Sequence, residues 1–188
     1  MKVAITGGIG SGKSYVCRQL RSFGIEVYDC DAAAKRLMRN NAQLQADLIR
    51  LVGEGVYQDG ILQKAVLANY LLADEAHKQA VNDVVHPAVA SDFEQSGLDW
   101  LESAILYESG FVNRTHFDKV VCVTAPLEVR VQRVMERDGI DRQKTLEWIH
   151  AQMPQDKVVA LCDYEIVNDG QRDIEQQIAH ILRQMDKA

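Results

Sequence analysis

The feature that most constrains this chain is a glycine-rich segment near its N-terminus. Residues 7–14 read Gly-Gly-Ile-Gly-Ser-Gly-Lys-Ser and directly follow an apolar run, Val3-Ala4-Ile5. They fit the pattern G-x-x-x-x-G-K-[ST] in the context of strand, loop and helix that gives this motif its meaning. Because glycine has no Cβ atom, the backbone N–H groups of such a loop can turn inward around an anion. The segment therefore predicts a phosphate-binding loop and not simply a flexible turn.

The positions of this loop have different expected roles. We expect Lys13 to reach the β- and γ-phosphates of a nucleotide and Ser14 to ligate Mg²⁺, while the helix that starts here adds its positive N-terminal dipole. The residues expected to contact the nucleotide are Gly8, Ile9, Gly10, Ser11, Gly12, Lys13, Ser14 and Tyr15. The loop alone indicates a bound nucleotide but not what is done with it.

Composition excludes several classes of protein. The chain has 188 residues, a hydrophobic fraction of 47% and a formal net charge of −6, which is ordinary for one globular domain with insertions and argues against a nucleic-acid partner. Four cysteines lie in or beside apolar segments without metal-ligand spacing, so we expect them to be reduced. Met1-Lys2 leads directly into the first expected strand and no apolar run has transmembrane length. These features predict a cytoplasmic protein with no membrane partner, and they leave the oligomeric state open.

Apolar runs that are typical of strands alternate with helical patterns along the whole chain. The expected strands are 2–6, 25–28, 98–106, 119–124 and 164–167. The expected helices are 13–21, 32–38, 42–51, 63–72, 74–85, a segment beginning at 127, 141–152 and 174–185. We expect a loop over 53–60 and a break or kink at His86, because Pro87 disfavours the α conformation of the residue before it. The pattern predicts a three-layer α/β fold with a parallel sheet covered on both faces.

The lengths of the segments between strands suggest how the domain is organised. The helical stretch between the second and third strands is far longer than a minimal crossover needs, which suggests a substrate-binding insertion. We expect a nucleotide-binding core formed by 1–29, 96–132 and 159–188, a helical acceptor-binding insertion over 30–95, and a mobile lid over 133–158.

A carboxylate pair, Asp29 and Asp31, follows the second expected strand. In open α/β sheets ligands bind at the carboxyl ends of the strands, so we expect these carboxylates on the same side as the phosphate loop. The Asn-Lys-x-Asp run by which GTP-binding switch proteins read guanine is absent from the sequence. A phosphate loop, an acidic pair and a large helical insertion are instead the parts of a kinase that acts on a small molecule.

Further matches extend over nearly the whole chain. They comprise 6–14, 24–31, Asp59-Gly60-Ile61-Leu62, Val85-His86-Pro87, Leu106-Tyr107-Glu108, Arg133 with Arg137-Asp138, Gln152-Met153-Pro154 and 163–168. In order and spacing these segments resemble the dephospho-CoA kinase family, the P-loop kinases that phosphorylate the ribose 3′-hydroxyl of dephospho-CoA. The chain departs from the family pattern at Tyr15, Lys64, Glu102-Ser103-Ala104 and Val158. None of these departures touches Lys13, Ser14 or Asp31, so the resemblance implies an active enzyme that uses ATP and Mg²⁺.

The resemblance assigns the catalytic base to Asp31. A carboxylate at the end of this strand can accept the proton of the attacking 3′-hydroxyl, which agrees with that assignment. The alternative is that Asp31 is only the N-cap of the helix over 32–38, a position that Asp suits, and both roles could hold together. Asp29 either supports Mg²⁺ through water or orients the loop, and we do not choose between these roles.

Two arginines late in the sequence are expected to contact ATP. Arg133 and Arg137 lie four residues apart and so share a helical face, where both could stabilise charge on the transferring phosphoryl group; the alternative is a solvated polar face. With Lys13 and Asp31, Arg137 completes the expected catalytic set. By resemblance only, Asn168 is expected to border the adenine.

The remaining expected contacts are with the acceptor. His86 and Glu108 are assigned to the acceptor site by resemblance, although a histidine before a proline is more often a packing residue. Lys35, Arg36 and Arg39 are close in sequence to Asp31, and of these we expect Lys35 and Arg39 to bind the acceptor's pyrophosphate rather than only to form an exposed face. Two alternatives remain open, namely another small-molecule or nucleoside monophosphate kinase of the same fold, and a nucleotide-binding module without catalysis.

Overall fold

The computed structural model describes residues 1–187, which form two compact units. We call the first the sheet unit; it contains Met1–Tyr28, Leu98–Glu108 and the residues from 116 onward. The second, the helical unit, contains Asp29–Gly97 and Ser109–Thr115. Within residues 1–187, no helix is both long enough and apolar enough to cross a membrane.

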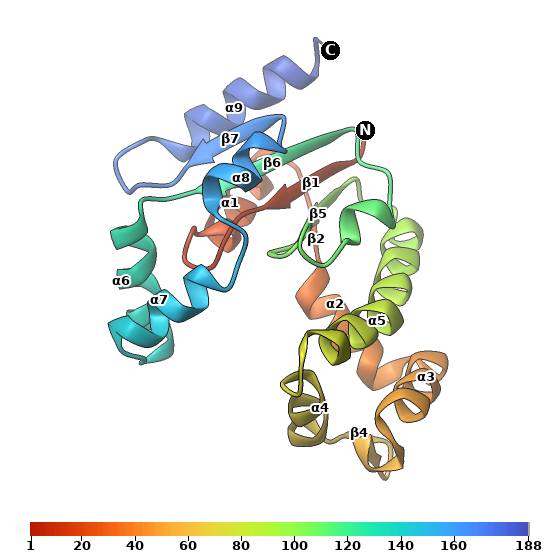
Figure 1. The fold of residues 1–188 in the computed structure, drawn as a ribbon. Coiled ribbons are helices and arrows are strands. Elements are labelled where there is room, and N and C mark those ends of the chain that lie inside the picture. The colour runs from red at the N-terminus through yellow and green to blue at the C-terminus, as the bar shows by residue number, and fades with distance from the viewer. Residues whose placement is uncertain (188) are drawn as a thin grey trace. The chain divides into compact units, whose positions relative to one another are not determined.

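A five-stranded sheet forms the centre of the sheet unit (Figure 1). Its strand order is β2 (Val27–Asp29), β5 (Trp100–Glu102), β1 (Val3–Thr6), β6 (Lys119–Thr124) and β7 (Tyr164–Val167). β1 pairs in parallel with both β5 and β6, and β6 pairs in parallel with β7. The chain thus builds the sheet first on one side of β1 and then on the other, so β1 is central. The predicted parallel sheet is confirmed.

Apolar side chains pack one face of this sheet against two helices, α1 (Lys13–Leu20) and α9 (Ile174–Met185). Figure 1 shows α9 running alongside β7. The buried cluster takes alternate residues of β1 and β6, as the two-residue period of a strand requires, and helical stripes from α1 and α9. Its members are Val3, Ile5, Val16, Leu20, Val121, Val123, Ile166, Ile174, Ile178, Ile181 and Met185.

Three further helices of the sheet unit lie between β6 and β7. They are α6 (Leu127–Asp138), α7 (Arg142–His150) and α8 (Gln155–Ala160). α6 and α7 pack against each other, and α8 contacts β6. The sequence did not predict α8, whose six residues are too few to show a helical period. A short 3₁₀ turn, Arg21–Phe23, follows α1.

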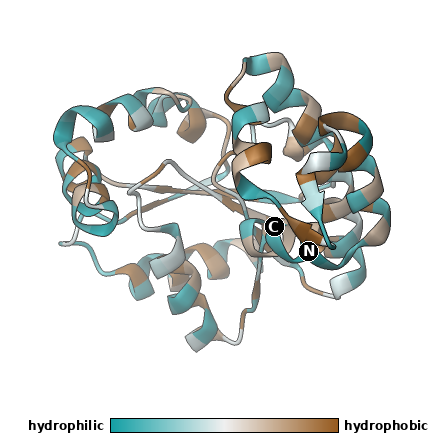
Figure 2. Cartoon of the chain, turned by 90° about the horizontal axis from the view of Figure 1, so that it is seen from below, coloured by the Kyte–Doolittle hydropathy of each residue, from teal (hydrophilic) through white to brown (hydrophobic). Residues whose placement is uncertain are grey.

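The helical unit is built around the long helix α5 (Glu75–Ser96). α2 (Cys30–Asn40), α3 (Ala42–Val52) and α4 (Lys64–Leu71) all contact it. Figure 2 shows hydrophilic and hydrophobic segments alternating along the helices, as expected for amphipathic helices. The buried side chains of α5 include Val81, Val85, Val89 and Phe93. A 3₁₀ turn, Phe111–Asn113, completes the unit.

The local structure differs from expectation at three places. Of the break or kink expected at His86, the break is wrong, because α5 continues through Pro87 to Ser96 while its buried residues hold it against α2 and α3. The strand expected over 98–106 is limited to Trp100–Glu102. The segment 53–60, expected as a loop, contains the 3₁₀ turn Glu54–Val56 and enters a hairpin of β3 (Tyr57–Gln58) and β4 (Ile61–Leu62).

The hairpin turn has a recognisable sequence signal. Asp59 and Gly60 have φ angles of 50° and 76°, the left-handed conformations that a two-residue type I′ turn requires. Asp-Gly is a favoured pair for this turn, but two-residue strands are too short to show an alternating pattern. The hairpin could therefore have been inferred from its turn but not from its strands.

Candidate active site

The phosphate loop connects the end of β1 at Thr6 to the start of α1 at Lys13. Gly12 is the N-cap of α1 in the left-handed conformation, and its carbonyl accepts the N–H groups of Tyr15 and Val16. Gly7, Gly10 and Gly12 all have positive φ angles, of 143°, 79° and 89°. The loop thus needs glycine at these positions for its backbone conformation alone.

The loop also needs glycine because other segments lie directly against it. A Cβ atom on Gly7 would lie 2.2 Å from the carbonyl oxygen of Val123, and one on Gly12 would lie 2.1 Å from Nδ2 of Asn168. Asn168 also donates from Nδ2 to the Ser11 carbonyl (2.9 Å), and its own N–H bonds to the Thr124 carbonyl. β6 and the residue after β7 therefore hold the loop from the side of the sheet.

The side chains of the loop fit an anion. The hydroxyl of Ser11 is fully buried and has no hydrogen-bond partner within residues 1–187, although a buried polar group normally has one. A phosphate oxygen would supply that acceptor, and the glycine backbone leaves room for it. Ser14 and Tyr15, in the first turn of α1, are exposed. In the described residues, no three acidic, histidine or cysteine side chains group as a metal site.

Lys13 is a buried cation at the start of α1. Its Nζ lies 3.7 Å from Oε1 of Glu102, at the end of β5, and its side chain is 10% exposed. Burial lowers the pKa of Lys13 below its usual value, and the charge of Glu102 opposes that shift. Glu102 thus partly neutralises a charge that a bound polyphosphate would neutralise more fully. The sequence showed Glu102 only as a departure from the family pattern.

Two arginines of α6 contact the phosphate loop. Nη1 of Arg133 donates to the carbonyls of Gly10 (3.4 Å) and Ser11 (3.3 Å), and its Nη2 donates to Oδ1 of Asn168 (3.4 Å). Arg130 is buried, and its Nε donates to the carbonyl of Ile9 (2.9 Å). The structure therefore brings Arg133 and Asn168 to the phosphate loop.

Arg137 makes a different contact from Arg133. Its Nε and Nη2 donate to both carboxylate oxygens of the adjacent Asp138, at 2.9 and 2.6 Å. This hydrogen-bonded pair raises the pKa of Arg137 and lowers that of Asp138. The side chain of Arg137 is 60% exposed. The two arginines predicted to share a target have different partners in this structure.

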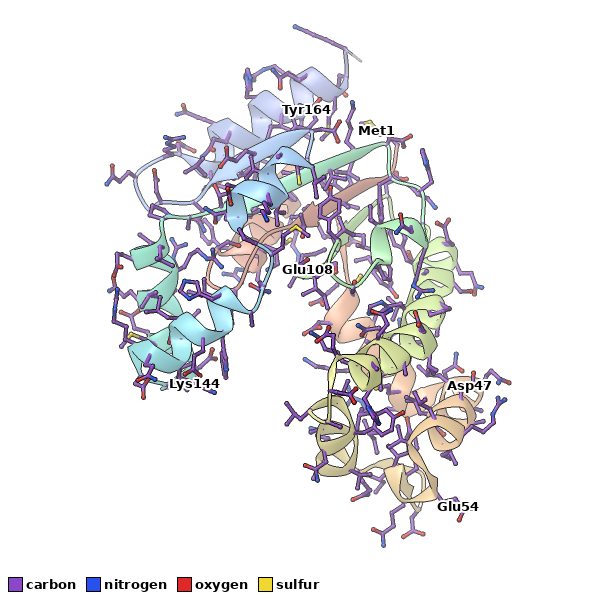
Figure 3. The ribbon with its side chains drawn as sticks, viewed as in Figure 1. Met1, Asp47, Glu54, Glu108, Lys144 and Tyr164 are labelled. Carbon is purple, nitrogen blue, oxygen red and sulfur yellow. The ribbon has the colours of Figure 1, made fainter. Side chains whose placement is uncertain are left out.

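Residues from the end of α7 to the start of α8 also bond to other segments of the sheet unit. Gln152 accepts the N–H of Ile9 through Oε1 at 2.7 Å, and Gln155 accepts the N–H of Ala125. Glu108, labelled in Figure 3, accepts the N–H of Met153 at 3.1 Å. The predicted acceptor-binding residue Glu108 is thus bonded to the segment predicted as a lid.

A pocket of about 690 Å³ lies beside the phosphate loop in the sheet unit. Its lining comes from the loop and α1, from Arg133 on α6, and from the segment that joins β7 to α9. The lining residues that the loop and the predicted site contribute are Gly12, Tyr15, Arg133 and Asn168. The pocket is large enough for a nucleoside and polar enough to orient it.

The predicted acidic residues of the helical unit lie at the start of α2. Asp29 is the N-cap, and its Oδ1 accepts the N–H of Ala32 at 2.9 Å. The suggestion that Asp31 is the N-cap was therefore wrong, because the helix begins at Cys30, two residues before its expected start. Asp31 lies in the first turn with its side chain 89% exposed and 3.4 Å from Nζ of Lys35. Arg39 donates from Nε to the carbonyl of Lys35.

His86 is a partly buried side chain of the helical unit, close to Arg114 and Asp83. Its ring packs edge-on against Phe111, with ring centroids 5.5 Å apart, and its Nδ1 has no partner among the described residues. Arg114 donates to Asp83 at 2.6 Å. Burial and the charge of Arg114 lower the pKa of His86, whereas the charge of Asp83 and a hydrogen bond that the ring makes to the backbone of Ser109 oppose this shift. His86 is thus held as a neutral side chain.

Sequence analysis missed Arg130 and Gln152 as residues of this site. Arg130 was not assigned to the site, and Gln152 appeared only as part of the matching segment Gln152-Met153-Pro154. A single sequence cannot show that a helical arginine will be buried. The position of Gln152 in a matching segment was the one available signal.

Comparison with known proteins gives a consistent result. The family model described as dephospho-CoA kinase matches residues 1–173. A dephospho-CoA kinase from Bacteroides fragilis is 38% identical over 189 residues, covering 97% of this chain and 91% of that protein. A crystal structure of a Thermus thermophilus protein is similar at 32% identity and a TM-score of 0.83, covering 98% of this chain and 97% of the other. Shikimate kinase from Acinetobacter baumannii shares the fold at 16% identity and a TM-score of 0.56, covering 99% of this chain and 93% of the other.

Proposed function

Because this chain belongs to the dephospho-CoA kinase family, we propose that it transfers the γ-phosphoryl group of ATP to the ribose 3′-hydroxyl of dephospho-CoA. The products are CoA and ADP. The observation that carries this proposal is the family match over residues 1–173, joined to a glycine loop whose buried Ser11 hydroxyl lacks a partner within the described chain. The match covers the helical segment as well as the loop, so it identifies more than the shared fold.

The phosphate loop would bind the triphosphate of ATP. Its backbone N–H groups and Lys13 would hold the β- and γ-phosphates, with Arg133 adding positive charge at the far side of the loop. The pocket beside Tyr15 and Asn168 would take the nucleoside. Mg²⁺ would bind Ser14, phosphate oxygens and water, since this ion keeps several waters and needs few protein ligands.

Transfer requires a base for the attacking alcohol, and Asp31 is the residue we assign to it. Its carboxylate would take the proton of the 3′-hydroxyl as that oxygen forms a bond to the γ-phosphorus. The bond between this phosphorus and the bridging oxygen of ADP breaks, and ADP leaves. The exposed side chain of Asp31 leaves its second oxygen free to face a substrate, because Lys35 contacts only Oδ2.

Other residues would orient the substrates. Arg137 would stabilise charge on the transferring group once freed from Asp138, and Lys35 and Arg39 would bind the acceptor's pyrophosphate. His86 and Glu108 would support the acceptor. Movement of a lid formed by 133–158 would exclude water and favour transfer to the alcohol over hydrolysis. We retain the cytoplasm as the predicted location.

A coupled assay of ADP release tests the acceptor. The purified enzyme is supplied with ATP, Mg²⁺ and one acceptor at a time: dephospho-CoA, AMP, CMP or pantothenate. We expect turnover with dephospho-CoA and none above background with the others. Turnover on another acceptor would identify a different kinase, and ATP binding without turnover on any acceptor would identify a non-catalytic module.

A further inference from the structure

Ile9, the third residue of the phosphate loop, is held at both of its backbone polar groups by side chains from distant segments. Its N–H donates to Oε1 of Gln152 at 2.7 Å, and its carbonyl accepts from Nε of Arg130 at 2.9 Å. These partners lie 143 and 121 residues further along the chain. Neither bond belongs to a strand or a helix, so each one fixes the loop directly.

Each bond orients a whole peptide plane. A trans peptide group is planar and its N–H and carbonyl point in opposite directions. When Gln152 binds the Ile9 N–H, the Gly8 carbonyl must point the other way, where it accepts the N–H of Ser11 at 3.1 Å. When Arg130 binds the Ile9 carbonyl, the Gly10 N–H must point away from Arg130. Gln152 therefore sets the direction of the Ile9 N–H, and Arg130 sets that of the Gly10 N–H.

The burial of Arg130 is unusual for a side chain of this charge. The residue is only 6% exposed, and in the part of the chain that the structure describes no acidic group lies within ion-pair distance of it. Burial lowers its pKa, and its charge in turn lowers that of nearby Lys13. Lys13 and Arg130 are thus two cations in one region, and Glu102 is the acidic partner of Lys13. An uncompensated buried charge is costly, so a bound anion would relieve it.

The glycines of the loop are fitted to these partners. A Cβ atom on Gly8 would lie 2.4 Å from Nη2 of Arg130 and 3.2 Å from Oε1 of Gln152. A Cβ atom on Gly10 would lie 2.6 Å from the backbone oxygen of Arg130. Gly8 does not have a positive φ angle. A side chain at position 8 would therefore displace the guanidinium of Arg130, whereas the backbone conformation there does not itself call for glycine.

We propose that Arg130 and Gln152 are positioning residues that hold the peptide groups on both sides of Ile9, so that the phosphate loop has its anion-binding shape before ATP arrives. This inference rests on the proposed function, because it takes the anion to be the triphosphate of ATP. Preorganisation of this kind lowers the cost of ordering a site when the ligand binds. Loss of either side chain should weaken ATP binding more than it slows the chemical step.

A double-mutant cycle between Gly8 and Arg130 tests the proposal. The dissociation constant of ATP is measured without acceptor by calorimetry for the wild type, Gly8→Ala, Arg130→Ala and the double variant. We expect Gly8→Ala and Arg130→Ala each to raise the dissociation constant of ATP about tenfold or more. Gly8→Ala would push the guanidinium aside, and Arg130→Ala would remove it. The double variant should bind ATP within about twofold of Arg130→Ala, because the methyl group then meets no guanidinium.

Two further variants separate the effect of the positioned Nε–H group of Arg130 from the effects of its charge and of a general loss of stability. Arg130→Lys keeps a cation but lacks the Nε–H that holds Ile9, so we expect it to bind ATP as weakly as Arg130→Ala within about threefold. Arg183→Ala is the matched control, because this exposed arginine of α9 lies outside both the phosphate loop and the predicted lid. Its ATP affinity should stay within about twofold of the wild type. Circular dichroism and apo melting temperatures report whether each variant is folded.

The results distinguish this inference from the proposed function. A wild type that does not bind ATP contradicts the proposed function. A wild type that binds ATP while folded Arg130→Ala binds it equally well contradicts only the positioning role. Additive losses in the double variant, or full recovery by Arg130→Lys, would also overturn that role. If Arg130→Ala does not fold, Gln152→Ala takes its place, and unchanged ATP affinity in that folded variant overturns the proposal.

Discussion

At the scale of single residues, the site combines side chains held by many contacts with side chains left exposed. Lys13, Arg130 and Ser11 are buried around the phosphate loop. The side chain of Asp31, by contrast, is 89% exposed and pairs with Lys35. Buried groups of this kind fix where an anion binds, whereas an exposed carboxylate is free to meet a second substrate. We therefore expect a substitution of a buried residue to affect ATP binding, and a substitution of Asp31 to affect the chemical step.

We expect Asp31→Asn to lower kcat for dephospho-CoA phosphorylation by about 10²- to 10⁴-fold, because an amide cannot accept the proton of the attacking hydroxyl. The dissociation constant of ATP, measured without acceptor, should stay within about twofold of the wild-type value. Asp47→Asn on α3, in the same helical unit and labelled in Figure 3, is the matched control. Normal turnover by Asp31→Asn would show that the base is another group.

His86 should contribute to the pH dependence of stability. Burial and Arg114 lower its pKa in the folded state below the ordinary value of 6.5, so folding favours the neutral ring. The contribution of His86 to stability is present above about pH 6.5, its pKa in the unfolded chain. This contribution is lost as the pH falls through the lower pKa of the folded state.

Urea unfolding at pH 7 and pH 5 measures this contribution. We expect the free energy of unfolding of the wild type to fall by more over this interval than that of His86→Gln, in which no group titrates at this position. His116→Gln removes an exposed histidine and should behave like the wild type. An equal fall in the wild type and His86→Gln would contradict the burial of a neutral His86.

At the scale of elements, α5 carries a proline within its length. Pro87 cannot donate the helical hydrogen bond to the carbonyl of Asp83, and a proline within a helix costs about 3 kcal/mol relative to alanine. The helix nevertheless continues, because buried residues on both sides of Pro87 pack the helix within its unit. Packing therefore overrides a local preference here.

Pro87→Ala should raise the free energy of unfolding by about 1–2 kcal/mol, since the gain in helix propensity exceeds the entropy that proline removes from the unfolded chain. Thermal unfolding measures the change. Pro126→Ala is the control, because Pro126 is the N-cap of α6, where no helical N–H is missing. A lower melting temperature for Pro87→Ala would show that this proline is favourable where it stands.

The elements also show how much of the fold and site the sequence could predict. The phosphate loop, the five strands and most helices have strong local signals, since each depends on residue type and period over several positions. The hairpin around Asp59-Gly60 and the six-residue helix α8 are too short for any period. Arg130 and Gln152 act through contacts more than a hundred residues away, which no local pattern contains. Glu102 was visible only as a departure from the family.

At the scale of the whole molecule, the residues proposed to act together are divided between two units. The sheet unit contains the phosphate loop, Arg130, Arg133 and Asn168, and the helical unit contains Asp31, Lys35, Arg39 and His86. The family match spans both, over residues 1–173. In the proposed function, the sheet unit binds the phosphoryl donor, and residues of the helical unit serve as the base and bind the acceptor.

The identity of the phosphorylated product tests this account most directly. The enzyme is incubated with ATP, Mg²⁺ and dephospho-CoA, and the products are analysed by ³¹P nuclear magnetic resonance. We expect ADP and, in equal amount, a new phosphomonoester signal coupled to the ribose 3′ proton. Release of inorganic phosphate with dephospho-CoA unchanged, or a phosphate attached at any other position, would contradict the proposed transfer.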